Sequence, residues 1–557
     1  MRYLILWIIL INVWTINALA NTILPPQIRQ TSFIYCVNGI ITTFNPQIAS
    51  TGLIIDLLAA QLYNRLLEVN PFTFKLNSEL ASHWKSLDKG ITYQFYLKRN
   101  IPFQTTNWFT PTRTLNADDV IFSFSRMFDK NHPYHYVGGG NYSYFDSLQL
   151  ANNIRSIRKI DNYTVEFKLY TPDMSFLWHL ATRYAPILSE EYAQYLNKIN
   201  HKEFIDWQPV GTGPFMLVGY QNGQFIKLTR HNNYWKGKPL MQQVVIDLGS
   251  GGTGRISKLL TGECDVLAYP VASQLKMLRE DARFRLSIRA GMNIAYLIFN
   301  TSNPPFDQLK VRQTIAYSIN NKRLIQSIYY GAAEMATSIL PRASWAYDNQ
   351  IKVTDYNPEK AKEMLKELGL ADMKLDLLVP VISQSYNPSP LKTAELIQAD
   401  LEKVGIKMNI LPVEGNLLKN KISNQKYHMV LNGWSTDSND PDSFFRPLLS
   451  CQAIDLHTNW SKWCNSYFDE ILRKALVSQN ISSRINYYHK AQSLLAKELP
   501  ILPLAYSLYI QVYRYDIKGL IITAFGNSSF AEVYRDGSSK IPLPANFYFN
   551  DEEGVAW

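Results

Sequence analysis

Three aspartates lie within six positions in the segment NGWSTDSNDPDSFF, residues 432–445. Such carboxylates could bind a cation, form a solvated turn, or provide negative charge inside a binding site. A calcium loop of the EF-hand type needs oxygen ligands on alternate residues and a glycine at its sixth position. Asp437, Asp440 and Asp442 do not have this spacing, which argues against a calcium loop. The Asn-Asp-Pro tripeptide favours a turn, so a turn and a binding site remain as interpretations.

Other short motifs do not combine into a catalytic site. The segment GSGGTG, residues 249–254, fits the glycine pattern of dinucleotide-binding loops, but no acidic residue follows about twenty positions later to bind a ribose. Ser-x-x-Lys occurs without the Ser-Asp-Asn and Lys-Thr-Gly motifs of acyl-serine enzymes. His132 and His135 in HPYH indicate a surface loop or, alternatively, a metal or haem contact. We therefore expect a binding protein rather than an enzyme, and no metal site.

The N-terminus is typical of a secretory signal peptide over residues 1–20. Arg2 precedes an apolar run, and residues 18–20 (Ala-Leu-Ala) form a small-residue cleavage site. An uncleaved membrane anchor is the alternative, but polar residues interrupt the apolar run before it reaches the length of a span. We expect an exported mature chain without a membrane span. An oxidising compartment permits disulfides among the four cysteines, which allow three pairings.

Length and composition indicate a globular protein of two or three domains. A chain of 557 residues exceeds what one hydrophobic core normally supports, and 46% of its residues are hydrophobic against 18% charged. The formal net charge of +10 is spread along the chain. It favours a basic surface that faces anionic lipid or polymer, whereas the absence of any nucleic-acid-binding motif argues against a dedicated nucleic-acid function.

The elements that must position the aspartates can be read from hydrophobic patterns. Alternation predicts strands over 91–99 and 162–170. Asp307 is expected to cap a helix that ends at Gly331. Asn-Pro at residues 357–358 opens a further helix that a glycine closes at position 369.

A βαβ unit is predicted just before the aspartate cluster. Apolar runs at 375–379 and 407–413 flank a helix that opens at Ser389 and closes at Gly405, which predicts a parallel sheet covered by helices. Residues 428–434 indicate a further buried strand, and the aspartates follow its carboxyl end. Ligands of open α/β sheets bind at the carboxyl ends of strands, so the cluster lies where a binding site is expected.

Several motifs in order resemble the peptide-binding components of ABC importers, that is, the dipeptide- and oligopeptide-binding type of bacterial solute-binding proteins of family 5, in particular the Sap-type branch associated with resistance to antimicrobial peptides. The motifs are LNADDVIFSFSR (115–126), VGTGPF (210–215), RHNNYWKGKP (230–239), LLTGECDVLAYP (259–270), FNTSNPPFDQLKVRQTIAYSIN (299–320) and GWSTDSNDPDSFF (433–445). The resemblance covers nearly the whole mature chain.

The resemblance implies an α/β, type II periplasmic-binding-protein fold with two lobes and an extra subdomain. The implied first lobe combines residues 21–62, 212–289 and 508–557; residues 63–211 form the extra subdomain and residues 290–507 the second lobe. It also implies a monomeric periplasmic receptor that delivers peptides to an inner-membrane permease and its ATPase subunits. A secreted hydrolase and a periplasmic chaperone are the alternative functions.

The resemblance also implies site residues and disulfides. The implied ligand-binding residues are Asp437, Trp434, Gly433, Gln384, Tyr386, Thr51 and Gly52, and the implied disulfides are Cys36 to Cys264 and Cys451 to Cys464. Asp437 corresponds to the residue that pairs with the peptide ammonium, while the other two aspartates are expected to shape the turn.

The sequence differs from dipeptide binders at the position that would contact the carboxylate end of the ligand. Gln384 stands where dipeptide binders have the arginine that clamps the peptide carboxylate, and a neutral amide cannot replace that charged pair. No cofactor is expected, and a longer, amidated, cationic or non-peptide ligand such as haem becomes an alternative.

Overall fold

The structure is a computed structural model. It describes residues 26–49, 53–249, 251–352, 354–370, 372–414, 417–418, 421–422, 427–526 and 528–537. The predicted signal peptide and two of the predicted site residues, Thr51 and Gly52, lie outside the described residues. No helix among these residues combines the length and the apolar character that a membrane crossing requires.

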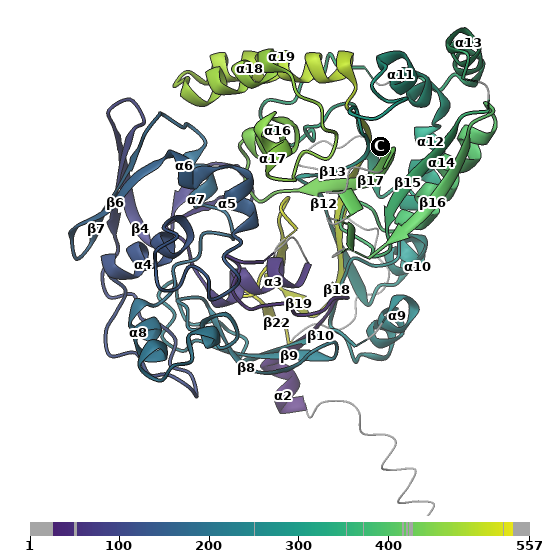
Figure 1. The fold of residues 1–557 in the computed structure, drawn as a ribbon. Coiled ribbons are helices and arrows are strands. Elements are labelled where there is room, and N and C mark those ends of the chain that lie inside the picture. Colours follow the sequence, from purple (N-terminus) through teal and green to yellow (C-terminus); the bar gives the residue numbers. More distant parts are fainter. Residues whose placement is uncertain are drawn as a thin grey trace, which may run out of the picture.

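A twelve-stranded mixed sheet runs through the molecule, in the order β16-β15-β17-β13-β18-β11-β1-β10-β9-β8, with β12 and β14 pairing β18 (Figure 1). Its strands are β1 (Ser32–Cys36), β8 (Phe215–Gln221), β9 (Phe225–Arg230), β10 (Gln243–Asp247), β11 (Val266–Ala268), β12 (Phe284–Ala290), β13 (Asn293–Phe299), β14 (Ala333–Met335), β15 (Lys374–Pro380), β16 (Lys407–Val413), β17 (Met429–Ser435) and β18 (Ile501–Arg514). The long strand β18 pairs β13 through residues 501–505 and β12 through residues 508–514. One strand therefore connects the two halves of the sheet.

A separate four-stranded sheet belongs to the segment between β1 and β8. It contains β4 (Ala81–Leu87), β5 (Thr92–Leu97), β6 (Ile154–Asp161) and β7 (Thr164–Leu169), with helices α4 (Ala117–Phe128), α5 (Ser143–Ser147), α6 (Leu150–Asn153), α7 (Phe176–Leu180) and α8 (Glu190–Lys198). The predicted strands at 91–99 and 162–170 are confirmed as β5 and β7, which pair antiparallel. One hydrophobic core joins this sheet to β1 and its neighbours through residues such as Phe33, Phe95 and Phe167.

The other helices surround the main sheet. They are α2 (Pro26–Gln30), α3 (Leu53–Leu62), α9 (Gly252–Thr261), α10 (Leu275–Glu280), α11 (Leu309–Ser318), α12 (Asn321–Leu324), α13 (Pro358–Leu368), α14 (Pro390–Glu402), α16 (Asp442–Leu449), α17 (Gln452–Asp455), α18 (Ser466–Val477) and α19 (Ile481–Glu498). The predicted βαβ unit is confirmed, because β15 and β16 pair in parallel on either side of α14. Asn357 and Gly369 cap α13 as predicted.

The predicted single helix from Asp307 to Gly331 is wrong. Helix α11 starts after Gln308 and ends at Ser318, and Ile319 is extended. The Asn320 side chain then accepts a hydrogen bond from the Arg323 N–H (3.0 Å) and starts α12. This cap offers the backbone an alternative to a continuous helix.

Strand β13 carries side chains of two separate cores on its two faces, as the period of a strand requires. Ile294, Tyr296 and Ile298 belong to one core, whereas Leu297 and Phe299 belong to the other. The first face is the one that bears the cavity described below. The boundaries of the three predicted domains stay a prediction.

Candidate functional site

A cavity of about 790 Å³ lies where β13 and β17 meet helices of the 127–152 segment. Its most prominent walls are aromatic: Tyr144, Tyr184, Tyr296, Tyr386, Trp434 and Trp460. Figure 1 shows α5 and α6 of that segment beside α16 and α17. The cavity thus joins side chains from parts of the chain more than 300 positions apart, and its volume is typical of sites for small ligands.

Gly433 allows the side chain of Tyr386 to pack against β17. A Cβ atom at this position would lie 2.2 Å from Tyr386 Cδ2 and 2.5 Å from the carbonyl oxygen of Ile294. The Tyr386 hydroxyl donates to Asn432 Oδ1 (3.1 Å), and the Tyr329 hydroxyl donates to the Tyr386 carbonyl (2.8 Å). Tyr386 is therefore held at its hydroxyl and at its backbone carbonyl as a wall of the cavity.

Asp437 follows β17 and is 3% exposed. Its Oδ2 accepts a hydrogen bond from the backbone N–H of Arg183 and lies 4.0 Å from the side-chain Nε of the same arginine. Its Oδ1 is buried without a hydrogen-bond partner among the described residues. Asp437 itself is not among the described lining residues, but Tyr184, which follows Arg183, and Ser435, two positions before Asp437, are. A buried carboxylate oxygen without a donor beside a cavity is suited to bind a ligand cation.

Asp440 and Asp442 do more than shape the turn. Asp440 Oδ1 accepts the Asp442 N–H (3.1 Å), which is the expected turn contact, but both carboxylates are fully buried. Asp440 Oδ2 lies 2.8 Å from Arg484. Burial raises the pKa of Asp440, opposed by the charge of Arg484. The side-chain charges of this segment are thus built into the protein interior.

Asp442 belongs to a buried polar cluster between two parts of the chain. Its Oδ2 accepts a hydrogen bond from Arg446 Nε at 2.8 Å, and Arg446 also donates to the Leu148 carbonyl (3.1 Å) and to Asp173 (3.2 Å). Burial alone would raise the pKa of Asp442, but Arg446 and His179 outweigh it and lower the pKa to about 2. Arg446 therefore connects α16 to the segment that carries the four-stranded sheet.

Gln384 lies in a tight turn at the edge of the site. Its backbone N–H donates to the Asn387 carbonyl (2.9 Å), and its side chain is partly exposed. It is not among the described residues that line the cavity. Of the described predicted residues, the structure thus places Gly433, Trp434 and Tyr386 on the cavity wall and Asp437 beside it, with Gln384 farther out.

His135 is buried and lines the cavity, with its Nδ1 2.8 Å from the Arg126 carbonyl oxygen. His132 is half-buried against Phe122. The HPYH segment is therefore folded onto the cavity and is not simply a surface loop. Within the described part of the chain, no group of three or more His, Cys, Asp or Glu residues is placed to hold a metal ion.

Both predicted disulfides are present, Cys36 to Cys264 and Cys451 to Cys464. The second closes a loop, residues 451–464, that contributes Leu456, His457, Thr458, Trp460 and Ser461 to the cavity. Residues 451–464 follow the aspartate segment in the sequence, but their place on the cavity wall was not predicted. The sequence signal that could have indicated this wall is an aromatic residue and a histidine inside a short disulfide loop.

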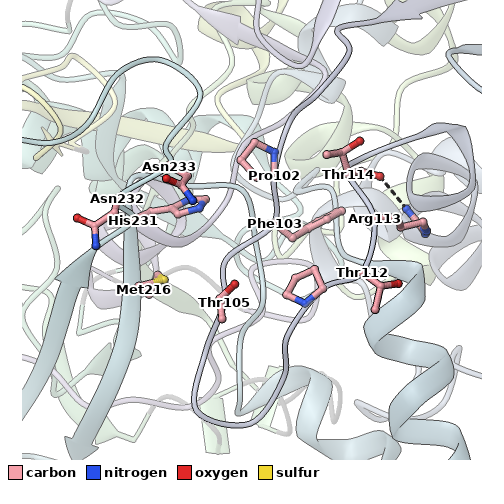
Figure 2. A pocket seen from close by; sticks show the side chains of 11 residues that line it. Pro102, Phe103, Thr105, Thr112, Arg113, Thr114, Met216, His231, Asn232 and Asn233 are labelled. Atoms are coloured by element: carbon pink, nitrogen blue, oxygen red, sulfur yellow. Dashed lines mark hydrogen bonds between the residues drawn. The ribbon is translucent and has the colours of Figure 1, made fainter.

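A second hollow of about 400 Å³ lies elsewhere (Figure 2). Its walls include Phe103, Arg113 and His231. The Arg113 guanidinium is held by Asp119 at 2.6 Å and Glu190 at 3.2 Å, so its charge is already neutralised within the protein. This hollow shares no described lining residue with the larger cavity, which remains the candidate site.

Comparisons with known proteins agree with this geometry. Residues 75–455 match the family model "Bacterial extracellular solute-binding proteins, family 5 Middle". The chain is 60% identical over 530 residues to the probable ABC transporter periplasmic-binding protein SapA of Escherichia coli K12, covering 95% of this chain and 97% of that protein. It is 36% identical to heme-binding protein A of Haemophilus influenzae, covering 91% and 92% of the two chains.

The chain is also similar to a solved structure of a solute-binding protein. The dipeptide-binding protein of Pseudoalteromonas sp. SM9913 in complex with Met-Leu is 40% identical and superimposes with a TM-score of 0.85, covering 91% of this chain and 100% of that chain. This similarity confirms the predicted type II periplasmic-binding-protein fold. The family model spans more than half of the chain and the curated relatives nearly all of it: the chain belongs to family 5 of the bacterial extracellular solute-binding proteins.

Proposed function

We propose that the protein is the periplasmic receptor of an ABC importer, which binds peptides in the aromatic cavity and delivers them to an inner-membrane permease. Two relatives support this class of function: the probable ABC transporter periplasmic-binding protein SapA of Escherichia coli and a dipeptide-binding protein with bound Met-Leu. The observation that carries the proposal is Asp437, a buried carboxylate near the cavity, one oxygen of which has no hydrogen-bond partner among the described residues.

The mechanism requires binding energy and no chemical step. The α-ammonium of a peptide pairs with Asp437 Oδ1 while Oδ2 stays bonded to the Arg183 N–H. The aromatic walls and the exposed polar groups of the cavity accept varied side chains, because hydrated pockets and backbone contacts tolerate variation. Gly433, Trp434 and Tyr386 shape the wall next to this anchor.

Peptide is favoured over haem because the anchor is an anion. Haem carries propionate carboxylates, which a buried aspartate would repel. His135 and His457 line the cavity and provide the nitrogen that a haem iron would need, so an absorption titration with haemin belongs beside the peptide experiment. A Soret shift at one equivalent, without competition by peptide, would favour haem.

The direct test is incubation of the mature protein with a mixed peptide library, followed by removal of unbound material and mass spectrometry. We expect intact peptides with free amino termini to be retained at about one per protein. Cleaved peptides would support a hydrolase, and retention of unfolded proteins alone would support a chaperone. Either outcome would contradict the receptor.

A further inference from the structure

A buried histidine, His179, lies beside one wall of the cavity. It belongs to α7, is fully buried, and is not among the described lining residues. Its Nδ1 lies 3.0 Å from the hydroxyl oxygen of Tyr144, which does line the cavity. His179 therefore contacts a wall of the site without being part of that wall itself.

Tyr144 lies near the Asp437 anchor. Its ring stacks on the ring of Tyr184, with centroids 4.5 Å apart and an interplanar angle of 14°. Tyr184 follows Arg183, whose backbone N–H binds Asp437 and whose guanidinium lies 5.1 Å from the Tyr184 ring centroid. Burial raises the pKa of the Tyr144 phenol, and the charge of Asp437 raises it further. A shift of the Tyr144 ring would thus change a wall near the proposed ammonium contact.

The hydrogen bonds around His179 have one direction. Ser175, at the start of α7, has its hydroxyl 3.1 Å from His179 Nε2. That hydroxyl donates its single proton to Asp173 Oδ1, so toward the histidine it can only accept. Nε2 must then carry the proton, and in the neutral imidazole Nδ1 is left as an acceptor for the Tyr144 hydroxyl. The donors therefore point from the cavity wall through the histidine and the serine to Asp173.

The far end of this chain of hydrogen bonds is held by the other half of the molecule. Arg446 of α16 donates to Asp173 Oδ2 (3.2 Å) and to the Ser175 hydroxyl oxygen (3.3 Å). Asp442 of the same helix has its Oδ2 3.5 Å from His179 Nε2. With the proton on Nε2, this carboxylate is a second acceptor beside the histidine. Two charged residues of α16 thus keep the imidazole in the orientation that presents Nδ1 to the cavity wall.

We infer that His179 is a positioning residue for peptide binding, which fixes the hydroxyl of Tyr144 and with it a wall of the binding cavity. This inference rests on the proposed function. A ring that is fixed before binding loses less conformational freedom when a ligand packs against it, and such preorganisation raises affinity. The histidine acts through Tyr144 and not by contact with the peptide.

A double-mutant cycle between His179 and Tyr144 tests this inference. The probes are free-amine peptides of two, four and eight residues that begin with Met-Leu, and calorimetry measures their affinity. His179→Gln should lower affinity about two- to tenfold, the range that corresponds to one hydrogen bond, because the glutamine amide reaches the place of Nε2 and not that of Nδ1. Tyr144→Phe should lower it by a similar factor. In the Tyr144→Phe background the histidine has no hydroxyl to hold, so His179→Gln should cost no further affinity.

Further variants separate positioning from a merely structural role. His179→Asn places an amide where Nδ1 lies, so it should keep more affinity than His179→Gln even if both variants unfold at a lower temperature. Ser175→Ala removes the acceptor of Nε2 and tests the same chain should the buried glutamine prevent folding; its loss of affinity should also vanish in the Tyr144→Phe background. Tyr134→Phe is the matched control and should bind as the wild type does, because the Tyr134 hydroxyl donates to the Ala193 carbonyl and neither residue is among the described lining residues.

Three results would overturn the inference and leave the receptor function intact. They are equal losses of affinity in the wild-type and Tyr144→Phe backgrounds, equal losses for His179→Asn and His179→Gln, and a His179→Gln variant that is less stable but binds as the wild type does. If the wild-type protein binds none of the three probe peptides, the proposed function and this inference fail together.

Discussion

At the scale of single residues, Asp437 has its two carboxylate oxygens in different surroundings. Oδ2 is fixed by the Arg183 backbone, whereas Oδ1 has no donor within the part of the chain that the structure describes. Because Arg183 and Asp437 come from different parts of the fold, the orientation of the anchor depends on those parts being together. The proposed contact with a ligand ammonium is thus available only in the assembled cavity.

The neutral side chain at position 384 gives a prediction of gained selectivity. Gln384→Arg should improve binding of short free-acid peptides about tenfold, since a hydrogen bond to a charged group contributes about 1.5 to 3 kcal/mol. The amides of the same peptides should not gain. Gln384→Lys is the matched control, because it adds the charge without the planar fork and should gain less. Calorimetry that finds equal gains for acids and amides would contradict this.

The pKa of Asp442 gives a prediction on acid stability. Its folded pKa, about 2, lies below the value of about 3.9 in an unfolded chain. A lowered folded pKa stabilises the protein above the unfolded value, and this contribution is lost as the pH falls through the folded one. Asp442→Asn should therefore cost about 3 to 5 kcal/mol near pH 7, the cost of breaking a buried pair. The difference from wild type should shrink between about pH 4 and pH 2.

Urea unfolding from pH 7 to pH 2 measures this difference. Asp440→Asn is the matched control, because burial raises the pKa of Asp440. A raised folded pKa means that the carboxyl favours the folded state more at low pH, so the wild type should gain on this variant as the pH falls. If the stabilities of both variants relative to the wild type changed in the same direction with pH, the opposite pKa shifts of Asp442 and Asp440 would be contradicted.

At the scale of elements, local patterns predicted what local interactions determine. The βαβ unit and the caps of α13 follow from apolar periodicity and from Asn-Pro and Gly signals. The break between α11 and α12 was not predicted: the Asn320 side-chain cap was a local signal for it, but the Asn320 N–H also donates to Asp400 Oδ2 (3.0 Å), eighty positions away. A periodic pattern contains no information on such a contact.

The disulfide loop 451–464 gives a prediction for one element. Replacing Cys451 and Cys464 by serine should lower stability by about 3 kcal/mol, the effect expected for a loop of this length. Affinity for peptide should also fall, because the loop contributes Trp460 and its neighbours to the cavity.

The matched control replaces Cys36 and Cys264 by alanine. These cysteines are buried and are not among the described lining residues of the cavity. Thermal unfolding should show a loss of stability for both pairs, whereas calorimetry should show a loss of affinity for the loop pair alone. Unchanged affinity after removal of the loop disulfide would show that the loop does not determine binding.

At the scale of the whole molecule, the cavity is assembled from segments that the sequence separates widely. Gly433, Trp434 and Asp437 could be predicted to lie at or near the cavity because they are close together in the sequence and match a family motif. Tyr144, Tyr184 and the Arg183 N–H could not, because they face the site only through the packing of one half of the molecule on the other. No local signal in the sequence encodes that packing.

Contacts between the two halves predict closure upon binding. Arg446 binds Asp173 and the Leu148 carbonyl across the same boundary as the Asp437 contact. We expect one half to rotate relative to the other about the places where the chain passes between them, near residues 285–295 and 505–515. A ligand that contacts both halves favours the closed state. Small-angle scattering should show a smaller radius of gyration with a bound free-amine peptide. An unchanged radius at saturation would contradict closure, and the N-acetylated peptide is the control.

The central claim is that Asp437 binds a ligand ammonium, and calorimetry with one peptide in free-amine and N-acetylated forms tests it most directly. Asp437→Asn should weaken the free-amine peptide by roughly 2 to 5 kcal/mol, more than tenfold in affinity, because an enclosed ammonium would be left unpaired. The acetylated peptide, which has no charge at that end, should bind weakly to the wild type and change little with the substitution. Equal losses for the two forms would contradict the ammonium contact and leave Asp437 with a structural role alone.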